Sequence, residues 1–115
     1  MPLLRKEDQA KIAVAMEGVK NVTKTTAITS KEGWEGWSMR IFTLEKEGFT
    51  PRHTHDWPHI NYIISGKGTL FIDGKEQTVQ PGDTAYVKGG ELHQFQNAGD
   101  EDFSFICIVP EEGDK

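Results

Sequence analysis

The chain has little cysteine, no long apolar run and no cluster of positive charge. Its single cysteine, Cys107, cannot form an internal disulfide, so packing, a metal or a second subunit must stabilise the domain. The longest apolar stretches, 60–64 and 103–109, contain polar residues and are far shorter than the roughly 20 residues that cross a bilayer. These absences argue against a disulfide-held scaffold and against a transmembrane helix.

The charge balance is acidic. Thirteen Lys and Arg face eighteen Asp and Glu, the net charge is −5, and no run of basic residues exceeds two. Nucleic acid is a poor partner for such a surface, because phosphate binding uses clustered positive charge. The N-terminal residues also lack the apolar core of a signal peptide. We therefore expect a cytoplasmic protein without a nucleic-acid or membrane partner.

Length and composition predict one β-rich domain. The 115 residues fit a single domain, and 12 Gly with 5 Pro indicate many turns rather than long helices. We expect one domain over 1–115, with an N-terminal arm over 1–18, a β-barrel over 19–110 and a charged tail over 111–115. The tail is expected to be a solvated end.

Short strands separated by turn residues fill the middle of the chain. Asp73-Gly74 supplies the two positive φ angles of a type I′ hairpin turn, and Glu47-Gly48 is expected to end a strand. Eight to ten strands with no long helical period predict an all-β sandwich or barrel. The clearest segments are 19–29, 38–45, 60–65, 69–72, 75–79, 84–87, 92–96 and 103–109.

The four histidines are the main functional signal. His53, His55 and His59 share parity, and residues two apart in an extended segment point to the same face. His93 lies on a different predicted strand, so it joins them only if the fold returns that strand beside the first. Imidazole is the commonest side-chain ligand of divalent transition metals. We predict one metal site formed by all four.

Two stretches resemble the motifs of the cupin superfamily. Residues 48–66, GFTPRHTHDWPHINYIISG, resemble the first motif, in which a Gly precedes His-x-His, a Glu and a second Gly. Residues 82–97, GDTAYVKGGELHQFQN, resemble the second, with its Gly, Pro-x-Gly, His and Asn. The chain departs from the pattern by one residue fewer between Gly48 and His53, by Lys88 in place of Pro, and by His59 in place of the usual Glu ligand.

The resemblance implies a cupin jelly roll, a double-stranded β-helix barrel with the metal near one open end. The chain looks like the compact four-histidine monocupins of bacteria and archaea, which implies manganese or iron, with nickel, copper and zinc as alternatives, and a homodimer. Imidazole in place of a carboxylate makes the ion more electrophilic. A closed structural zinc tetrahedron is the competing interpretation, and an octahedral ion with two open positions is the one we favour.

Several residues outside the histidine set are candidates for the substrate pocket. Arg40 and Arg52 carry guanidinium groups, which bind a carboxylate bidentately. Trp57 either shields the mouth of the pocket or packs against Phe49 or a partner subunit. Cys107 either approaches the site as a redox-sensitive thiol or is a small buried apolar residue.

Two classes of function fit these features. The first is a metalloenzyme acting on a small oxygen-bearing molecule, by dioxygenase-like oxidation or by isomerase or lyase chemistry, with Glu91 the one nearby candidate base. The second is a non-catalytic ligand-binding or sensor module. The absence of an appended helix-turn-helix favours the enzyme. The imidazoles also need hydrogen-bond partners, and the choice stays open among Asn61, Tyr62 and Gln94.

Overall fold

The structure is a computed structural model that describes residues 2–114. That part of the chain contains strands and 3₁₀ turns but no α-helix, and no helix in it is long and apolar enough to span a membrane. The strands are β1 (Ile12–Ala13), β2 (Lys20–Ile28), β3 (Trp37–Phe49), β4 (His59–Ser65), β5 (Gly68–Ile72), β6 (Lys75–Val79), β7 (Thr84–Val87), β8 (His93–Asn97) and β9 (Phe103–Pro110). The 3₁₀ turns are η1 (Lys6–Asp8), η2 (Ser30–Glu32) and η3 (Glu111–Asp114).

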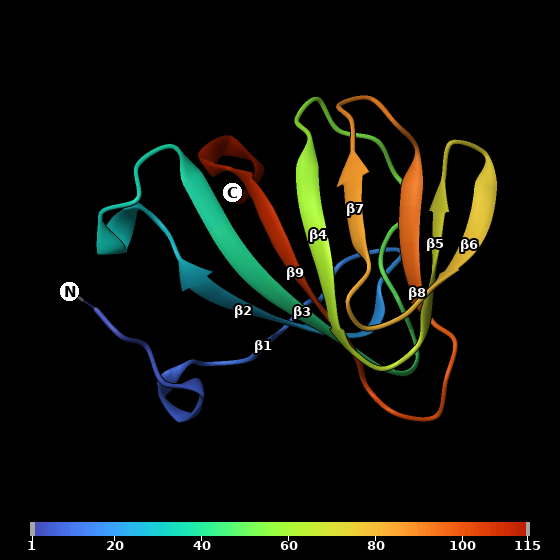
Figure 1. Cartoon of the computed structure of the whole chain (residues 1–115), viewed down its shortest axis with the longest axis horizontal. Helices are drawn as coiled ribbons and strands as arrows, with labels where there is room; N and C mark the ends of the chain where they lie inside the picture. The colour runs from blue at the N-terminus through green and yellow to red at the C-terminus, as the bar shows by residue number, and fades with distance from the viewer. Residues whose placement is uncertain (1, 115) are drawn as a thin grey trace.

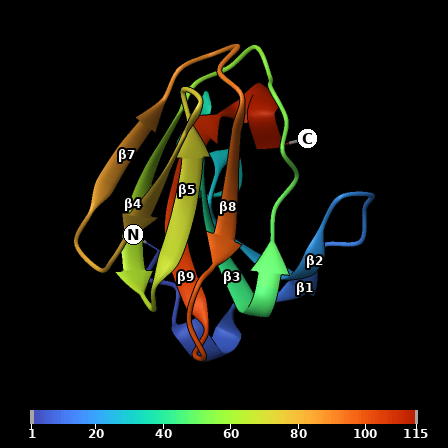
Figure 2. The ribbon, with the colours of Figure 1, turned by 90° about the vertical axis from the view of Figure 1, so that its right-hand side faces the viewer.

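The strands form one curled antiparallel sheet with the order β6-β5-β8-β3-β9-β4-β7, and β2 and β1 extend it from β3. β3 pairs with β2 and β9 along most of its length and with β8 at its end. The sheet therefore turns back on itself, so that β5, β6 and β8 face β3, β4 and β9 across an interior (Figures 1 and 2). The predicted all-β architecture is confirmed.

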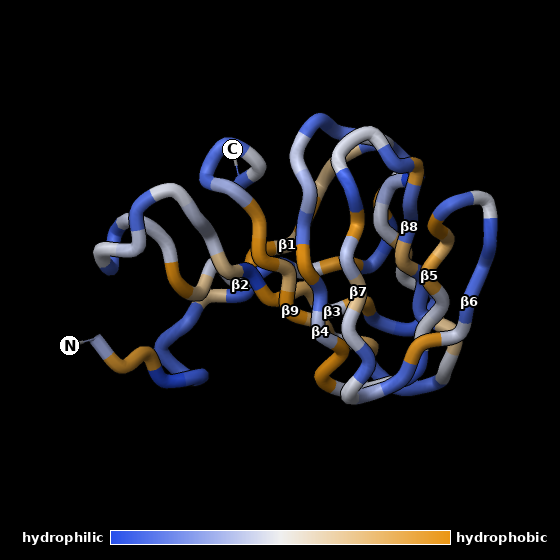
Figure 3. Tube along the Cα trace, turned by 45° about the horizontal axis from the view of Figure 1, so that its top comes forward, coloured by the Kyte–Doolittle hydropathy of each residue, from blue (hydrophilic) through white to orange (hydrophobic). Residues whose placement is uncertain are grey.

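Alternation of apolar and polar residues decides which side chains enter that interior. Every second residue of β9 is buried, beginning with Phe103, because successive side chains of a strand point to opposite faces. Phe95 of β8 stacks on Phe105 with ring centroids 4.2 Å apart, and Leu44 of β3 is fully buried beside them. Figure 3 shows the resulting contrast between the hydrophobic β9 and the hydrophilic outer strand β6.

The hairpin between β5 and β6 matches the sequence prediction. Asp73 and Gly74 have φ angles of 54° and 74°, as the two central residues of a type I′ turn require. Ile72 and Lys75 pair directly across it. The turn thus fixes the register of the two strands.

The predicted end of a strand at Glu47-Gly48 is wrong, because β3 continues to Phe49. The sequence signal there marks a bulge: Val22 pairs with Leu44, whereas Lys20 pairs with Phe49. Glu47 adopts a φ of 65°, in the left-handed region. Such a bulge bends a strand sharply, and here it carries the end of β3 toward β8.

The two ends of the chain differ in how well the sequence predicted them. Within the predicted N-terminal arm, Ile12 and Ala13 form a short strand that pairs with β2. The expectation of a solvated tail holds for the exposed Glu111 and Glu112 but is wrong for Asp114. The side chain of Asp114 is only 15% exposed and forms ion pairs with Lys24 and Arg40, because η3 folds back over the open end of the sheet.

Candidate metal centre

The four histidines come from two places that the curled sheet brings together. His53 and His55 lie in the loop between β3 and β4, His59 begins β4, and His93 begins β8. The backbones of His53 and His93 form an isolated bridge, with N–H to O distances of 3.2 and 3.1 Å. The return of the second strand to the first, on which the sequence prediction depended, is therefore present.

A close approach between two loops fixes the position of His55. The N–H of Gly90 donates to the carbonyl of His55 at 2.7 Å. A Cβ on Gly89 would lie 2.3 Å from the carbonyl oxygen of Asp56, far inside van der Waals contact. Only glycine fits at position 89, which explains why the loop after β7 is glycine-rich.

The imidazole rings converge on one point. The ligand nitrogens of His53, His55 and His93 all lie within 4.8 Å of one another. The Nε2 atom of His59 lies 3.2 Å from Nε2 of His93, and its ring centroid lies 5.2 Å from that of His55. The structure thus brings together all four residues that the sequence singled out, and the three-histidine cluster can hold a divalent metal.

Hydrogen bonds decide which nitrogen of each ring is free. Nδ1 of His55 donates to the carbonyl of Trp57 at 2.7 Å, and Nδ1 of His93 donates to the carbonyl of Glu91 at 2.8 Å. A neutral imidazole that carries its proton on Nδ1 has a bare lone pair on Nε2. Both Nε2 atoms are therefore available as ligands.

The third free nitrogen belongs to His59. Its Nδ1 bonds to Oδ1 of Asn61, whose amide is oriented by donation from Nδ2 to the carbonyl of Ile106 at 3.3 Å. The lone pairs of His59 Nε2 and His93 Nε2 then face each other at 3.2 Å. Two lone pairs at this distance repel unless a cation lies between or beside them, so the donor set fits a divalent transition metal.

The surroundings keep these rings neutral. Burial, followed by the neighbouring His93, lowers the pKa of His53 from 6.5 to about 4 and that of His59 to about 3. Burial also lowers the pKa of His93. Imidazole must be unprotonated to bind a metal, so at neutral pH His53, His59 and His93 are ready to bind one without releasing protons.

The histidines open into a cavity of about 360 Å³. Trp57 lines it and stacks on His55, with ring centroids 4.8 Å apart and planes 6° apart. The remaining wall is largely apolar and comes from β2, β3, β8, β9 and the segment after β1. Its apolar members are Val14, Met16, Val19, Val22, Phe42, Pro51, Phe95 and Phe105.

The two candidate arginines lie in different places. Arg40 lines the cavity, and its Nη2 donates to Sγ of Cys107 at 3.1 Å. Arg52 is absent from the cavity wall, because its guanidinium lies over the ring of Phe71 at 4.0 Å and its Nε donates to Gln94. The prediction that Arg52 lines the pocket is therefore wrong. The sequence contained an indication of this, because adjacent residues of an extended segment point to opposite faces and residue 52 thus points away from the face of His53.

Cys107 lines the cavity and is 4% exposed. Burial raises the pKa of its thiol, with the charge of Arg40 acting in the opposite direction. The side chain is thus a buried neutral thiol that contacts Arg40. Both features that the sequence analysis gave as alternatives are present, since the residue is buried and also lies beside the site.

Three further residues complete the site. Of the three candidates for hydrogen-bond partners of the imidazoles, Asn61 is fully buried and bonds to His59, whereas Tyr62 is 45% exposed and the side chain of Gln94 bonds to Arg52 and Thr50. Sequence reasoning missed Lys24, which lines the cavity, and Asp114, whose Oδ1 lies 3.6 Å from Nζ of Lys24. No local pattern marks these two, because only the tertiary fold brings β2 and the C-terminal turn together.

Known proteins with similar sequences have varied roles. The chain is 28% identical to the oxalate-binding protein of Thermotoga maritima over 98 residues, which is 82% of this chain and 80% of that protein. It is 30% identical to the 1-methylthio-D-xylulose 5-phosphate methylsulfurylase of Rhodospirillum rubrum over 67% of this chain, but it spans only 49% of that enzyme. The relatives therefore include both a binding protein and an enzyme.

The fold has close counterparts among solved structures. The polyketide cyclase RemF of Streptomyces resistomycificus superposes with a TM-score of 0.89 and 26% identity, covering 96% of this chain and 79% of that one. The family model described as the cupin domain matches residues 40–109, which is more than half of the chain and contains all four histidines. The chain belongs to the cupin family.

Proposed function

We propose that the chain is a small metalloenzyme that binds one divalent transition metal through His53, His55, His59 and His93. Manganese and iron are the proposed metals, and the substrate is a small oxygen-bearing organic molecule. The proposed reaction is a dioxygenase-like oxidation, with isomerase or lyase chemistry as its non-redox counterpart.

The observation that carries this proposal is the set of unprotonated Nε2 atoms beside the cavity. Each ring of His55, His59 and His93 is held by its Nδ1. The ligand nitrogens of His53, His55 and His93 lie within 4.8 Å of one another, and Nε2 of His59 lies 3.2 Å from that of His93. The cavity next to them holds about 360 Å³, enough for a small organic molecule beside a metal. A bound divalent ion supplies Lewis-acid polarisation of a substrate oxygen and, for manganese or iron, redox chemistry.

The protein groups at the cavity serve binding and orientation more than proton transfer. Among the described residues that line it there is no carboxylate. The side chain of Glu91 accepts the backbone N–H of Lys88 at 3.1 Å, which holds it in the loop. The apolar wall lowers the local dielectric and so strengthens each charge interaction with a bound molecule.

A non-catalytic binding module is the second candidate. It is favoured by the oxalate-binding protein of Thermotoga maritima, which matches over most of both chains. In that case the same histidines and cavity retain a small chelating acid without turnover. Fold alone does not choose between the two roles.

Oxygen uptake and product analysis test the proposal. Iron- and manganese-loaded protein is incubated with diketones, catechols, thiols and sugars, with His93→Ala as the control variant. Turnover that the control lacks is the expected result. Tight binding in calorimetry, without oxygen uptake or any change in the ligand, supports the binding module instead.

We also propose a homodimer. Ile60, Tyr62 and Ile64 are exposed along one face of β4, and Tyr86 of β7 pairs with Ile60 and is 59% exposed. Contiguous exposed apolar side chains of this kind mark contact surfaces. In a two-fold symmetric dimer the same surface of a second copy would cover them. Light scattering is expected to give about twice 12.9 kDa, with Tyr86→Lys reducing the mass, and a monomer mass for the parent protein contradicts this.

A further inference from the structure

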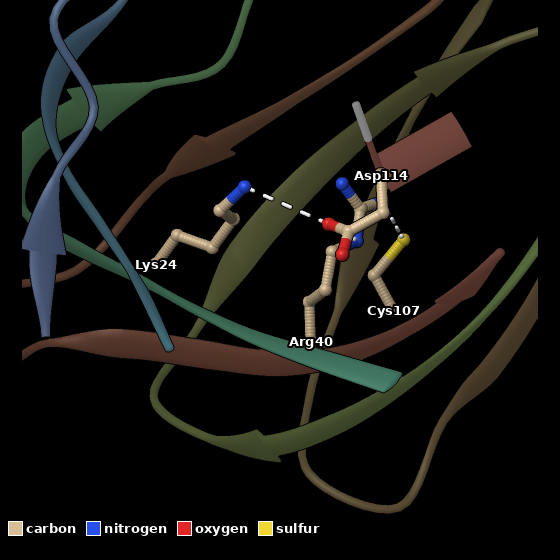
Figure 4. A network of polar contacts seen from close by, with 4 residues as sticks. All are labelled: Lys24, Arg40, Cys107 and Asp114. Atoms are coloured by element: carbon tan, nitrogen blue, oxygen red, sulfur yellow. Dashed lines mark hydrogen bonds and ion pairs between the residues drawn. The ribbon is translucent and has the colours of Figure 1, made fainter. Parts of the chain in front are cut away.

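Three charged residues from separate elements meet beside the cavity, and two of them, Lys24 and Arg40, line it. Lys24 comes from β2, Arg40 from β3 and Asp114 from the C-terminal turn η3 (Figure 4). Oδ1 of Asp114 lies 3.6 Å from Nζ of Lys24 and 3.7 Å from Nε of Arg40. One carboxylate therefore faces two cations, which leaves this wall with an excess of positive charge in a chain whose net charge is −5.

The carboxylate of Asp114 fits its cations imperfectly. Nε of Arg40 and Oδ1 of Asp114 are both buried, yet neither has a hydrogen-bond partner among the described residues. The side chains are 12% and 15% exposed, so the pair bears a desolvation cost without the bidentate geometry that offsets it. An oxyanion free to orient itself has a better arrangement available to it than Asp114 does.

The segment that carries Asp114 is short and docked by few contacts. η3 spans four residues, and the N–H of Glu111 donates to the carbonyl of Gly36 at 2.9 Å. Gly113 packs on Trp57 so closely that a Cβ there would lie 2.5 Å from the indole nitrogen. The turn thus rests on both a pocket aromatic and the two cations.

The rest of the cavity defines what else a ligand needs. Lys24 and Arg40 line it together with the histidines, and Phe42, Phe95 and Phe105 belong to the same wall. Arg40 is near enough to the cluster that its charge contributes to lowering the pKa of His59. A molecule that fills the cavity meets ligand nitrogens, an apolar surface and two cations.

We propose that Lys24 and Arg40 form an anion subsite which Asp114 occupies until an acidic ligand displaces it, so that η3 acts as a lid. The ligand class is an apolar or aromatic acid, a carboxylate or a phosphate ester, whose other end carries oxygens for the metal. The metal-binding end of this ligand rests on the proposed function, and the anion subsite does not.

The first experiment uses the full chain after treatment with a chelator, so that it is independent of the metal. Calorimetry measures the binding of benzoate, phenyl phosphate and the uncharged benzyl alcohol. Asp114→Asn is expected to bind one or both anions about tenfold more tightly than the parent protein, with benzyl alcohol unchanged. The anion that responds assigns the subsite to a carboxylate or to a phosphate.

Two further variants separate the subsite from general electrostatics. Glu112→Gln makes the same charge change at an exposed position of the same turn and is expected to bind like the parent. Adding Lys24→Gln to Asp114→Asn is expected to remove the gain. An equal gain in Glu112→Gln, or equal binding of the anions and benzyl alcohol by Asp114→Asn, overturns the proposal.

A structural readout tests the lid directly. Amide hydrogen exchange at residues 111–114 of the parent protein is expected to accelerate when a saturating anion is added, because the bond from Glu111 to Gly36 opens. Unchanged protection in the saturated protein contradicts displacement of the turn.

The second experiment adds the metal. Zinc-loaded Asp114→Asn is expected to bind 3,4-dihydroxybenzoate at least tenfold more tightly than catechol. If the metal-free experiment succeeds but zinc-loaded Asp114→Asn binds the two ligands equally, the proposed metal-binding end of the ligand is rejected. That result counts against the proposed function and leaves the anion subsite in place. Failure in the metal-free experiment rejects the subsite itself.

Discussion

The interior of the curled sheet has two ends that differ in kind, although the same strands run through both. At one end Phe103 packs on Phe95 and Phe105, and these last two rings also reach the wall of the cavity. At the other end β4 and β8 begin with His59 and His93, whose free nitrogens face each other. The first end stabilises the fold, and the second can therefore hold polar groups that cost stability until a ligand binds.

The largest expected effect comes from breaking the packed end. Phe103→Ala removes a fully buried ring and is expected to lower the free energy of unfolding by about 3–5 kcal/mol. Urea denaturation measures it. The metal affinity of the folded variant is expected to stay within about threefold of the parent, and a large loss of affinity contradicts the separation of the two ends.

The converse change is His93→Ala. It removes a ligand nitrogen that lies 3.2 Å from another, so metal affinity is expected to fall at least about 100-fold. The metal-free protein is expected to be as stable as the parent or more so, because a buried unsatisfied lone pair is removed. Zinc competition titrations and chelator-treated melting curves check both, and a strongly destabilised apoprotein counts against the account.

A smaller effect is expected from the residue that orients His59. Asn61→Leu keeps the size of the buried side chain but removes the acceptor for Nδ1, and such changes weaken metal binding about 10–100-fold. Tyr62→Ser is the matched control, since its side chain is exposed on the opposite face of β4. Equal affinities of the two variants contradict the role assigned to Asn61.

The smallest effect concerns pH. The pKa values of His53 and His59 are lowered to about 4 and about 3, from 6.5. Below pH 6.5 the unfolded chain binds protons that the folded chain does not, so the free energy of unfolding falls as the pH falls. This contribution is fully present above pH 6.5 and is lost progressively between pH 6.5 and 3.

Melting curves of chelator-treated protein from pH 7.5 to pH 4 measure this loss, which is expected to come mainly from the buried His59, because solvent screens the charge of the more exposed His53. The double variant with His53→Gln and His59→Gln is expected to show a shallower pH dependence over the same range. Parallel curves for the variant and the parent contradict buried, neutral histidines.

Most of the fold and the metal centre follows from local sequence patterns. The alternation in β9 and the Asp73-Gly74 turn each depend on residues a few positions apart, and the structure contains both. The spacing of His53 and His55 also indicated that they lie together, although both are in the loop between β3 and β4 rather than within a strand. Local patterns suffice here because the period of a strand directly determines which side chains share a face.

What the sequence did not predict depends on contacts between distant segments. The bulge at Glu47 has the same residues as a turn, and only the pairing of β2 with β3 distinguishes them. Asp114 is part of an acidic tail that reads as solvated, yet the fold places Lys24 and Arg40 next to it. The residues next to Asp114 in the sequence give no indication of which cations it contacts in the fold.

The most direct test is X-ray absorption at the metal edge of the zinc- or manganese-loaded protein. Scattering from four imidazole rings is expected, with metal–nitrogen distances of roughly 2.0–2.1 Å for zinc. The His59→Ala variant is expected to lose one of these rings. A shell dominated by oxygen or sulfur ligands, or a spectrum unchanged by the loss of His59, contradicts the four-histidine centre.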